Sequence, residues 1–431
     1  MSSRIQSLKS FLVPKVRHFV TFLMAQGVTM AGNLLYGLLC VRLLPIPDYA
    51  RFAVLFGYMG SLVVLLDIGI SNSLAPLVGE KIHDKQLIAD YVASLRQIAQ
   101  RLYLIMAPIT CVVFPLLVLK QHWPWKIVTA MTVIILGAAW FARVSSAYGT
   151  ILILRRDRPF WYRGQMISSL GTLVLLLIFW KLHWLNAFSA ILLNVAGIIF
   201  TSAFYFFRAR KLLGVTGVPS PEKRHSIVRL ILPNTPNVIF YALQGQISLM
   251  LITIFGHTAG VASVGALSRL AQIFVIFSQM NSILVEPYFA KLPREKLKAN
   301  YLGALGVIAL GCLAISLAAY TLPEIFLWIL GPKYATLRFE VMLVVVGSSI
   351  RYLSGTMWVI HSSRRFVYWW NNLSTISLTI LVQILYLWRA DLSTVRNVLY
   401  FNIVSAIASL LVNILCGTYG FLKGPRKIEA S

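Results

Sequence analysis

The stretch "ALSRLAQIFVIFSQMNSILVEPYF" (266–289) is apolar enough to cross a membrane, yet it carries four strongly polar side chains. A bilayer core about 30 Å thick needs about 20 apolar residues in a helix, and this stretch is long enough. Because successive helical residues are about 100° apart, Arg269, Gln272, Gln279 and Glu286 fall on one face. A polar face in lipid would leave its groups unsatisfied, so this face is predicted to turn toward protein or water.

The whole chain has the composition of a membrane protein. Of its 431 residues, 58% are hydrophobic and 12% charged, and the mean hydropathy is +0.77. Soluble domains carry about 25% charged residues, so a polytopic membrane protein is indicated. In a chain this apolar, the net charge of +26 indicates cytoplasmic loops and not a nucleic-acid surface. The four cysteines have no paired spacing, which indicates neither a disulfide framework nor a metal site.

Apolar runs of membrane-crossing length recur along the chain and predict its architecture. We count twelve, and the longest hydrophilic connection divides them six and six. We therefore predict an all-α polytopic membrane protein with twelve transmembrane helices in two six-helix lobes around a central cavity. The predicted spans lie near 19–41, 52–78, 102–119, 127–150, 164–180, 185–207, 231–255, 262–287, 301–321, 339–360, 370–388 and 396–420. The predicted parts are a cytoplasmic N-terminal segment 1–18, an N-lobe 19–207, a cytoplasmic linker 208–230, a C-lobe 231–420 and a cytoplasmic tail 421–431.

Lysine and arginine are unevenly distributed over the predicted loops. If both termini lie on one side, that side holds 27 of the 39 Lys and Arg residues, the opposite side nine and the spans three. Cytoplasmic loops of membrane proteins carry the cationic excess. Both termini are therefore predicted to be cytoplasmic.

Several other spans place polar residues on one helical face. These residues are Gln26, Thr29, Asn33 and Tyr36 in span 1; Gly60, Asp67 and Ser71 in span 2; Arg143, Ser146 and Thr150 in span 4; Asn234, Asn237, Tyr241, Gln244 and Ser248 in span 7; and Arg351, Ser354, Trp358 and His361 in span 10. We predict a water-filled cavity walled by spans 1, 2, 7 and 8, with spans 4 and 10 beside them. In spans 11 and 12, Gln383, Asn402 and Asn413 are predicted to form helix–helix hydrogen bonds.

Three arginines inside the spans indicate an anionic ligand. An arginine at the bilayer centre costs about 2.5–3.5 kcal/mol on insertion scales, so Arg143, Arg269 and Arg351 need a compensating role. Their planar guanidinium groups suit phosphate oxygens, and a ligand that enters from the membrane would be a lipid-linked phosphate or diphosphate. A structural alternative stays open for all three: Asp67 would neutralise an arginine on a neighbouring helix. It applies most to Arg143, in the closely packing stretch "AWFARVSSAYG" (139–149), and also to Arg269 and Arg351, and Glu286 would have an interfacial or packing role.

The stretch "GNLLYGLLCVRLLPIPDYARFAVLFGYMGSLVVLLDIGISNSLAPLVGE" (32–80) has a Gly/Asn-rich first helix, the short loop "RLLPIPDYARF" and a second helix with "LLDIGISNSLAP". It resembles the opening of the multidrug/oligosaccharidyl-lipid/polysaccharide exporter superfamily. More narrowly, it is similar to the polysaccharide-transporter branch that contains O-antigen flippases. Ala50 stands where the family pattern has glycine. The stretch "HTAGVASVGALSRLAQIF" (257–274) resembles the opening of the second half.

The resemblance implies a transporter with alternating access in the bacterial inner membrane. It would move a polyprenyl-diphosphate-linked oligosaccharide, for O-antigen or another surface polysaccharide, from the cytoplasmic to the outer leaflet. The residues expected to bind the diphosphate are Arg143, Arg269 and Arg351; those expected to bind sugars are Gln26, Asn33, Asn237, Tyr241, Gln244, Gln272 and Gln279. Asp67 and Glu286 are the candidates for proton or sodium coupling. We expect a monomer without cofactor or metal, without enzymatic activity and without a nucleic-acid partner, which works beside polysaccharide polymerase machinery.

Two other functions remain as alternatives. A multidrug exporter of the same superfamily shares the expected fold, but cationic drugs favour an acidic cavity and this one is basic. A membrane-embedded glycan polymerase or transferase usually needs a large outer loop or an acid/base pair at a membrane face. In the predicted outer loops, His257 and Glu324 stand alone.

Overall fold

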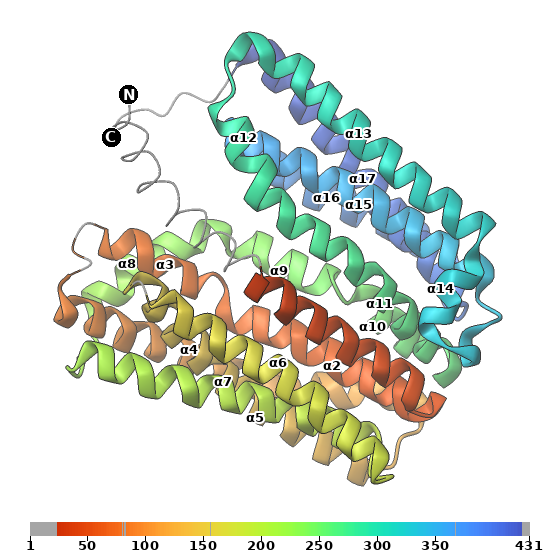
Figure 1. The fold of residues 1–431 in the computed structure, drawn as a ribbon, viewed down its shortest axis with the longest axis horizontal. Helices are drawn as coiled ribbons and strands as arrows, with labels where there is room; N and C mark the ends of the chain where they lie inside the picture. Colours follow the sequence, from red (N-terminus) through yellow and green to blue (C-terminus); the bar gives the residue numbers. More distant parts are fainter. Residues whose placement is uncertain (1–23, 80, 82, 156, 367, 425–431) are drawn as a thin grey trace, which may run out of the picture. The chain divides into compact units, whose positions relative to one another are not determined.

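The computed structural model describes residues 24–79, 81, 83–155, 157–366 and 368–424, and helices dominate this part of the chain (Figure 1). The described residues contain no strand, so the prediction of an all-α polytopic membrane protein is confirmed. The predicted segment 1–18 and residues 425–431 of the predicted tail lie outside the described residues. The helices are a first helix Met24–Leu43 and then α2 Ile46–Asp67, α3 Ile70–Val78, α4 Lys85–Val118, α5 Trp125–Leu154, α6 Arg158–Lys181, α7 Ala187–Leu213, α8 Pro221–Ile231, α9 Thr235–Gln244, α10 Ile247–Phe255, α11 Thr258–Met280, α12 Glu286–Lys291, α13 Arg294–Thr321, α14 Pro323–Leu330, α15 Arg338–Ser363, α16 Trp369–Leu387 and α17 Val395–Lys423.

The number of membrane-crossing helices falls slightly short of the predicted twelve. Ten described helices are long and apolar enough to cross a membrane, and a bent pair, Pro221–Gln244 with Ile247–Phe255, adds an eleventh. The remaining predicted span, 370–388, coincides with α16, which has 19 residues. Its buried polar residues lower its hydropathy; they are Asn371, Thr375, Thr379 and Gln383, spaced four apart so that they share one helical face.

Three predicted spans are interrupted and not continuous. Span 2 (52–78) breaks between α2 and α3, where Ile68 and Gly69 have positive φ angles of 42° and 80°. Span 7 (231–255) bends by 49° between α9 and α10. Span 8 (262–287) passes through a π-helical turn, Asn281–Val285, between α11 and α12. Such interruptions free backbone groups, and within a membrane they occur where protein or water satisfies those groups.

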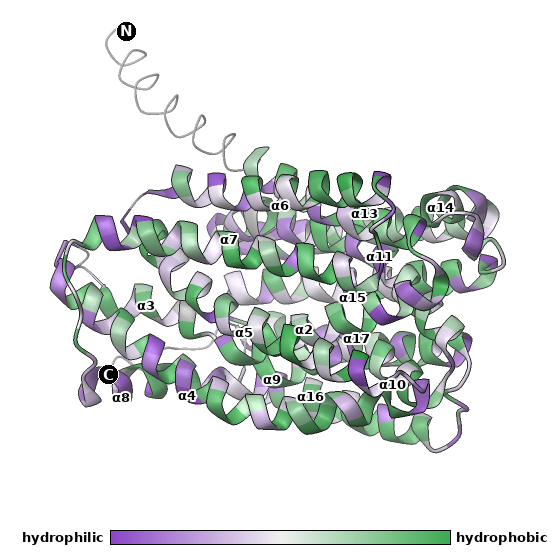
Figure 2. Ribbon diagram, turned by 90° about the horizontal axis from the view of Figure 1, so that it is seen from below, coloured by the Kyte–Doolittle hydropathy of each residue, from purple (hydrophilic) through white to green (hydrophobic). Residues whose placement is uncertain are grey.

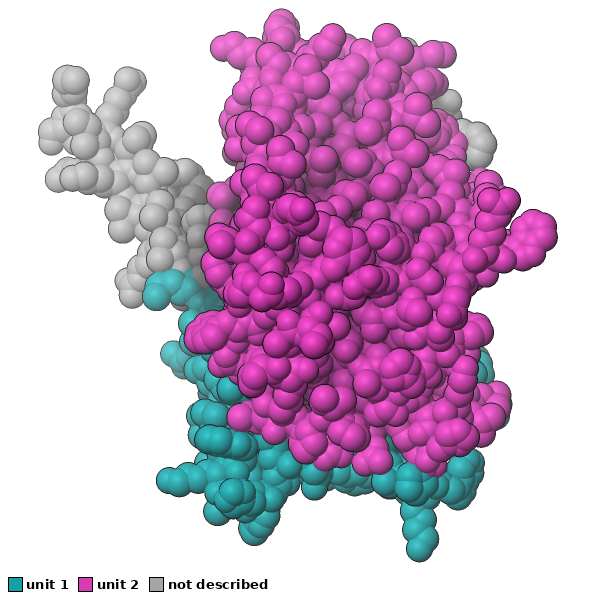
Figure 3. Space-filling model, turned by 90° about the vertical axis from the view of Figure 1, so that its right-hand side faces the viewer, with its two compact units in different colours: residues 1–39, 58–115, 124–239 teal, residues 40–57, 116–123, 240–431 magenta. Residues whose placement is uncertain are grey.

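The described chain divides into two compact units (Figure 3). Unit 1 comprises residues 1–39, 58–115 and 124–239, and unit 2 comprises residues 40–57, 116–123 and 240–431. Two connecting regions from the first half of the sequence therefore belong to unit 2. Residues 40–57 join the first helix to α2, and residues 116–123 join α4 to α5. The predicted linker 208–230 is helical at both ends, because α7 continues to Leu213 and α8 begins at Pro221.

In unit 1, α7 packs against α5 and α6. Small side chains are fully buried on both α5 and α7, including Ala138, Ala139 and Ala190, and such residues let helices approach closely. A Cβ atom at Gly197 would lie 2.7 Å from the side chain of Thr172, so α7 and α6 are in close contact there. One end of the unit holds a core of buried residues from α3, α4, α5, α7 and α8, among them Leu74, Ile88, Leu152, Tyr205 and Ile227.

In unit 2, α15 packs against α11, α13 and α17. Hydrogen bonds between side chains connect several of these helices. Asn413 donates to Ser354 over 2.9 Å, Gln383 donates to Ser405 over 2.9 Å and to Gln244 over 2.8 Å, and Ser248 donates to Asn402 over 2.7 Å. The prediction that Gln383, Asn402 and Asn413 join helices is therefore confirmed.

The outer surfaces of several helices are apolar, as expected for contact with lipid. Hydrophobic residues predominate along the middle of the helices (Figure 2), and on α13 the side chains of Val307, Leu310 and Leu313 are all exposed. The four most exposed tryptophans of the described chain lie at or near helix ends: Trp125, Trp184, Trp328 and Trp388. Tryptophan is enriched where a membrane meets water, and these four lie where the Lys/Arg count places the outer loops.

Candidate functional site

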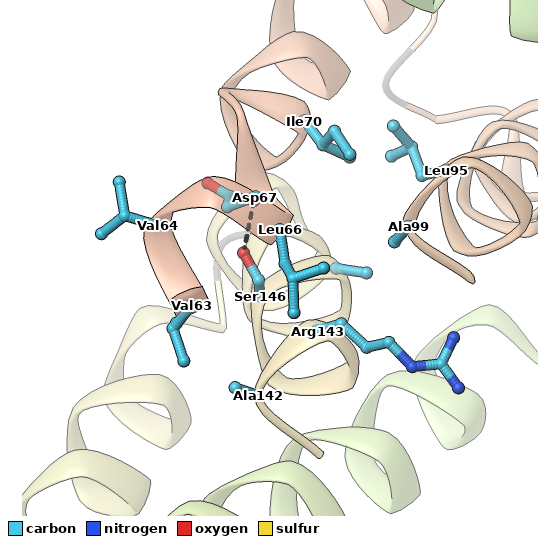
Figure 4. A pocket seen from close by; sticks show the side chains of 11 residues that line it. Val63, Val64, Leu66, Asp67, Ile70, Leu95, Ala99, Ala142, Arg143 and Ser146 are labelled. Carbon is cyan, nitrogen blue, oxygen red and sulfur yellow. Dashed lines mark hydrogen bonds between the residues drawn. The ribbon is translucent and has the colours of Figure 1, made fainter. Parts of the chain in front are cut away.

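A carboxylate marks the break between α2 and α3. Asp67 is the last residue of α2, and the left-handed backbone of Ile68 and Gly69 turns the chain into α3. Glycine adopts this conformation without strain, whereas a β-branched isoleucine does not. Ser146 of α5 donates a 3.0 Å hydrogen bond to Asp67 (Figure 4). The sequence "DIG" therefore ends one half-helix and places a carboxylate at its C-terminal end.

Asp67 also lines a cavity of about 200 Å³ inside unit 1 (Figure 4). Its walls come from α2, α3, α4 and α5 and are mostly apolar. The polar side chains that line it are Asp67, Ser146 and Arg143, so the cavity brings together two of the residues selected from the sequence. The apolar lining residues are Val63, Val64, Leu66, Ile70, Leu95, Ala99, Ala142 and Ala147.

The guanidinium group of Arg143 is held by aromatic rings and not by a carboxylate. Its guanidinium carbon lies 3.4 Å from the ring centroid of Trp140 and 5.9 Å from that of Tyr103, and its Nε donates to the carbonyl of Trp140 over 3.1 Å. The side chain is partly exposed and extends away from Asp67 (Figure 4). Among the described residues Arg143 has no ion pair, so the alternative in which Asp67 neutralises it directly is wrong.

In unit 2, Arg269 is buried against aromatic rings. The residue is 4% exposed, and its guanidinium carbon lies 4.4 Å from the centroid of Phe56 and 5.8 Å from that of Phe52. Its Nε has no hydrogen-bond partner in the described part of the chain. Within unit 2, therefore, Arg269 does not line a hydrated surface. Its polar neighbours on α11 differ from it, since Gln272 is half-buried and Gln279 is exposed.

Arg351 has the opposite environment. It lies on α15 with an exposed side chain, and Tyr241 of α9 is exposed as well. Two residues that were predicted to share its face are buried in contacts between helices: Ser354 accepts from Asn413 over 2.9 Å, and His361 lies 3.0 Å from the hydroxyl of Tyr301. Unit 2 thus leaves Arg351 and Tyr241 exposed and uses Ser354 and His361 for contacts between helices.

The remaining selected residues lie apart from these contacts. In unit 1, Gln26 donates to Gln165 over 3.4 Å, Asn237 donates to Asn234 over 3.3 Å, and Asn33 is exposed. In unit 2, Gln244 accepts from Gln383, as described above. Glu286 is half-buried at the start of α12 and forms no ion pair within the described chain.

Two buried polar groups were not selected from the sequence as site residues. Asn371 is fully buried, and neither atom of its amide has a partner in the described residues. His361 and Tyr301 form a buried pair between α15 and α13. The spacing of four residues between Asn371, Thr375 and Thr379 was a signal that the sequence analysis did not use. No spacing marks the pair His361–Tyr301, because its members lie 60 residues apart.

The fold has known counterparts among solved structures. The chain is similar to an inward-facing multidrug resistance MATE family transporter of the MOP superfamily (TM-score 0.65, 16% identity, covering 92% of this chain and 94% of that one). It is also similar to the lipid II flippase MurJ in an inward closed conformation (TM-score 0.68, 11% identity, 94% and 89%). A third similar structure is a MOP superfamily transporter from Pyrococcus furiosus, described as having a binding pocket of reverse polarity that suggests a different function (TM-score 0.59, 15% identity, 95% and 96%). No family model matches the sequence, and no curated protein matches it. At these identities the similarity shows that the chain shares the fold of these structures, and it leaves the role and the substrate open.

Proposed function

We propose that this protein is a flippase that carries polyprenyl-diphosphate-linked oligosaccharide repeat units across the bacterial inner membrane by alternating access. The product would serve O-antigen or other surface polysaccharide assembly. The protein would act as a monomer with both termini in the cytoplasm, and it would supply polysaccharide polymerase machinery.

The observation that carries this proposal is the charge of accessible residues inside the membrane-crossing helices. Arg143 is partly exposed, Arg351 is exposed, and neither has an acidic partner in the described residues. A guanidinium group without a counterion is costly at membrane depth, so an anionic ligand would offset that cost. Planar guanidinium groups bind phosphate oxygens through two parallel hydrogen bonds. A diphosphate on a lipid carrier has the matching charge and reaches these residues from the bilayer.

The other residues predicted to bind substrate differ in how well their exposure and hydrogen bonds fit that role. Tyr241 is exposed and suits a sugar or phosphate oxygen, and Gln272, Gln279 and Asn33 are accessible enough to contact sugars. Gln26, Asn237 and Gln244 would have to exchange a hydrogen bond within the protein for one to a sugar. The burial of Arg269 gives no support to a role in diphosphate binding, and the proposal does not depend on it.

A multidrug exporter is the second candidate, because the chain is also similar to a multidrug resistance transporter. Similarity of fold does not separate the two functions, but charge does. A cationic drug would be repelled by Arg143 and Arg351, whereas a lipid diphosphate would be attracted to them. The proposal therefore rests on these two charges and not on the fold.

The test replaces Arg143 and Arg351 singly with alanine in cells that depend on this protein for surface glycan. We expect lipid-linked repeat units to accumulate on the inner leaflet and surface glycan to fall about tenfold or more, since a hydrogen bond to a charged group contributes about 1.5–3 kcal/mol. Lys126→Ala, which removes an exposed cation at the start of α5, serves as control. Normal surface glycan in both arginine variants, combined with greater drug sensitivity, would favour the exporter instead.

A further inference from the structure

The cavity of unit 1 is large for the interior of a packed helical unit. It has a volume of about 200 Å³ and lies among α2, α3, α4 and α5. Protein interiors are packed about as densely as organic crystals, and voids larger than a water molecule are few. Water finds few hydrogen bonds in a mostly apolar space, so the side chains that line it lose packing contacts there. An apolar occupant would restore these contacts and stabilise the unit.

Small side chains keep this cavity open. Ala99 of α4 and Ala147 of α5 are buried and line it, and so does Ala142 of α5, which is half-buried. A larger apolar side chain at any of these positions would occupy the space with its own carbon atoms. The rest of the apolar wall consists of branched side chains: Val63, Val64, Leu66, Ile70 and Leu95. These walls suit a hydrocarbon group.

The cavity reaches the surface at more than one place. Leu66, Ile70 and Leu95 are between 1% and 3% exposed, whereas Val64 is 45% exposed and Arg143 is half-buried. The side chains of Val64 and Arg143 point in opposite directions (Figure 4). This arrangement suits a ligand with one end at Arg143, its next carbon atoms among the buried side chains and the rest of its chain leaving past Val64.

Two charged side chains at the wall fix the direction of such a ligand. Asp67 accepts the 3.0 Å hydrogen bond from Ser146, and the guanidinium group of Arg143 extends away from this carboxylate (Figure 4). A phosphate is repelled by the carboxylate and attracted to the guanidinium group. The ring of Trp140 lies against the guanidinium group at 3.4 Å, and phosphate oxygens bind such a group at its N–H edge and not at its face. The ligand would therefore bind with its phosphate at Arg143 and its carbon chain in the cavity.

The volume of the cavity matches a short piece of a branched chain. An apolar cavity of about 150 Å³ in another protein binds benzene, which has six carbon atoms. On that scale this cavity holds about one or two isoprene units of five carbon atoms each. The units that it holds are then the ones next to the phosphate, because Arg143 is part of the same wall.

We propose that this cavity binds the isoprene units next to the diphosphate of a polyprenyl carrier lipid, with the phosphate on Arg143. This inference rests on the proposed function and adds to it the site of the lipid chain. The protein then recognises the chain and the charge of the carrier together. A soluble diphosphate lacks the chain and binds more weakly.

The test measures Kd by titration calorimetry on the full-length protein in nanodiscs, with empty nanodiscs to correct for partition into lipid. Three ligands are compared: farnesyl diphosphate, an unbranched alkyl diphosphate of equal chain length, and inorganic diphosphate. Each buried methylene group contributes about fourfold to affinity, so farnesyl diphosphate should bind the parent about tenfold or more tightly than inorganic diphosphate. It should also bind more tightly than the unbranched ligand, because its methyl branches add buried carbon atoms.

Ala99→Leu fills the cavity from α4 and removes no charge. We expect it to weaken the binding of farnesyl diphosphate about tenfold or more and to leave that of inorganic diphosphate within about twofold. Ala142→Leu should act in the same direction from α5, and it replaces Ala99→Leu if that variant does not fold. Ala196→Leu is the matched control, because Ala196 is exposed on α7 and does not line the cavity.

The outcomes separate the chain site from the proposed function. If both cavity variants, folded by their thermal transitions, bind farnesyl diphosphate like the parent, the chain site is rejected and the flippase proposal stands. If the unbranched ligand binds the parent as tightly as farnesyl diphosphate and is lost equally in Ala99→Leu, the cavity takes an ordinary lipid chain and the isoprenyl assignment is rejected. If both cavity variants lose farnesyl diphosphate selectively while cells with Arg143→Ala or Arg351→Ala make normal surface glycan, the chain site stands and the flippase proposal is rejected.

Discussion

The hydroxyl of Ser146 donates a 3.0 Å hydrogen bond to the carboxylate of Asp67, and this bond links the C-terminal end of half-helix α2 to the middle of α5. Interrupted helices in membrane transporters often hold coupling ions at such ends, because the last carbonyl groups and the helix dipole favour a cation. Asp67 adds a full negative charge at this position and lines a cavity. Of the carboxylates selected from the sequence, it therefore has the geometry best suited to coupling.

The first prediction concerns this carboxylate. Replacing Asp67 with asparagine keeps the shape and removes the charge, so transport of lipid-linked glycan in proteoliposomes should become insensitive to an imposed proton or sodium gradient. Binding of substrate should change by less than about threefold, since Arg143 points away from Asp67. Asp391→Asn, which removes an exposed carboxylate in the connection between α16 and α17, is the matched control and should keep the coupling. Full gradient dependence in the asparagine variant would exclude Asp67 from coupling.

The second prediction tests the backbone at the break after α2. Gly69 has φ = 80°, where a Cβ atom is strained although no neighbouring atom would contact it. Gly69→Ala should therefore lower the unfolding free energy by about 1 kcal/mol. Gly60 lies within α2 and is equally open, so Gly60→Ala should be neutral or stabilising by about 0.5–1 kcal/mol. Thermal unfolding of both variants in one detergent measures the difference, and equal midpoints would show that the turn is not strained.

The third prediction separates two arginines that look alike in the sequence. Arg269 is buried over Phe56, and its charge has no acidic partner in the described residues, so Arg269→Met should leave the thermal midpoint unchanged or raised. Arg351 is exposed, and Arg351→Ala should leave stability within about 0.5 kcal/mol. Transport should respond in the opposite order, with a loss of about tenfold for Arg351→Ala and less than about threefold for Arg269→Met. A greater transport loss for Arg269→Met than for Arg351→Ala would indicate that Arg269 binds substrate.

The sequence predicted the helices well, because a membrane-crossing segment is recognised by the length of its apolar run. Its errors have physical causes. The break at Gly69 was missed because a single glycine inside an apolar run is compatible with a continuous helix. The extension of α4 was missed because hydropathy registers only the apolar part of a helix, and Arg96 lies outside that part. Helical periodicity in residues 85–101 was the unused signal.

The candidate site was only partly predictable. A helical projection places Arg269 and Arg351 on polar faces, but it does not say which neighbouring helix covers each face. Phe52 and Phe56 lie more than 200 residues from Arg269 in sequence, so its burial follows from tertiary packing alone. The contact of Arg143 with the ring of Tyr103 likewise depends on how α4 and α5 pack.

The last prediction concerns the connection between α7 and α8, which a carboxylate holds against α4. Asp90 accepts a 2.9 Å hydrogen bond from the backbone N–H of Val218 and another of 2.9 Å from Gln86, and it forms a 2.5 Å ion pair with Lys223. A Cβ atom at Gly217 would lie 2.0 Å from the carbonyl oxygen of Ala89, so the connection runs directly over the helix backbone. Asp90→Ala should release it, and hydrogen exchange of residues 214–220 should quicken about tenfold, because the anchoring bonds to a charged group contribute about 1.5–3 kcal/mol each.

Glu222→Gln is the matched control for this measurement. Glu222 lies in the first turn of α8, is exposed and forms no ion pair in the described chain, so its loss should leave exchange in 214–220 within about twofold of the parent. Lys223→Ala should give an intermediate increase, since it removes the ion pair and keeps the bond to Val218. Parent-like exchange in Asp90→Ala would mean that packing at Gly217, and not the carboxylate, holds the connection in place.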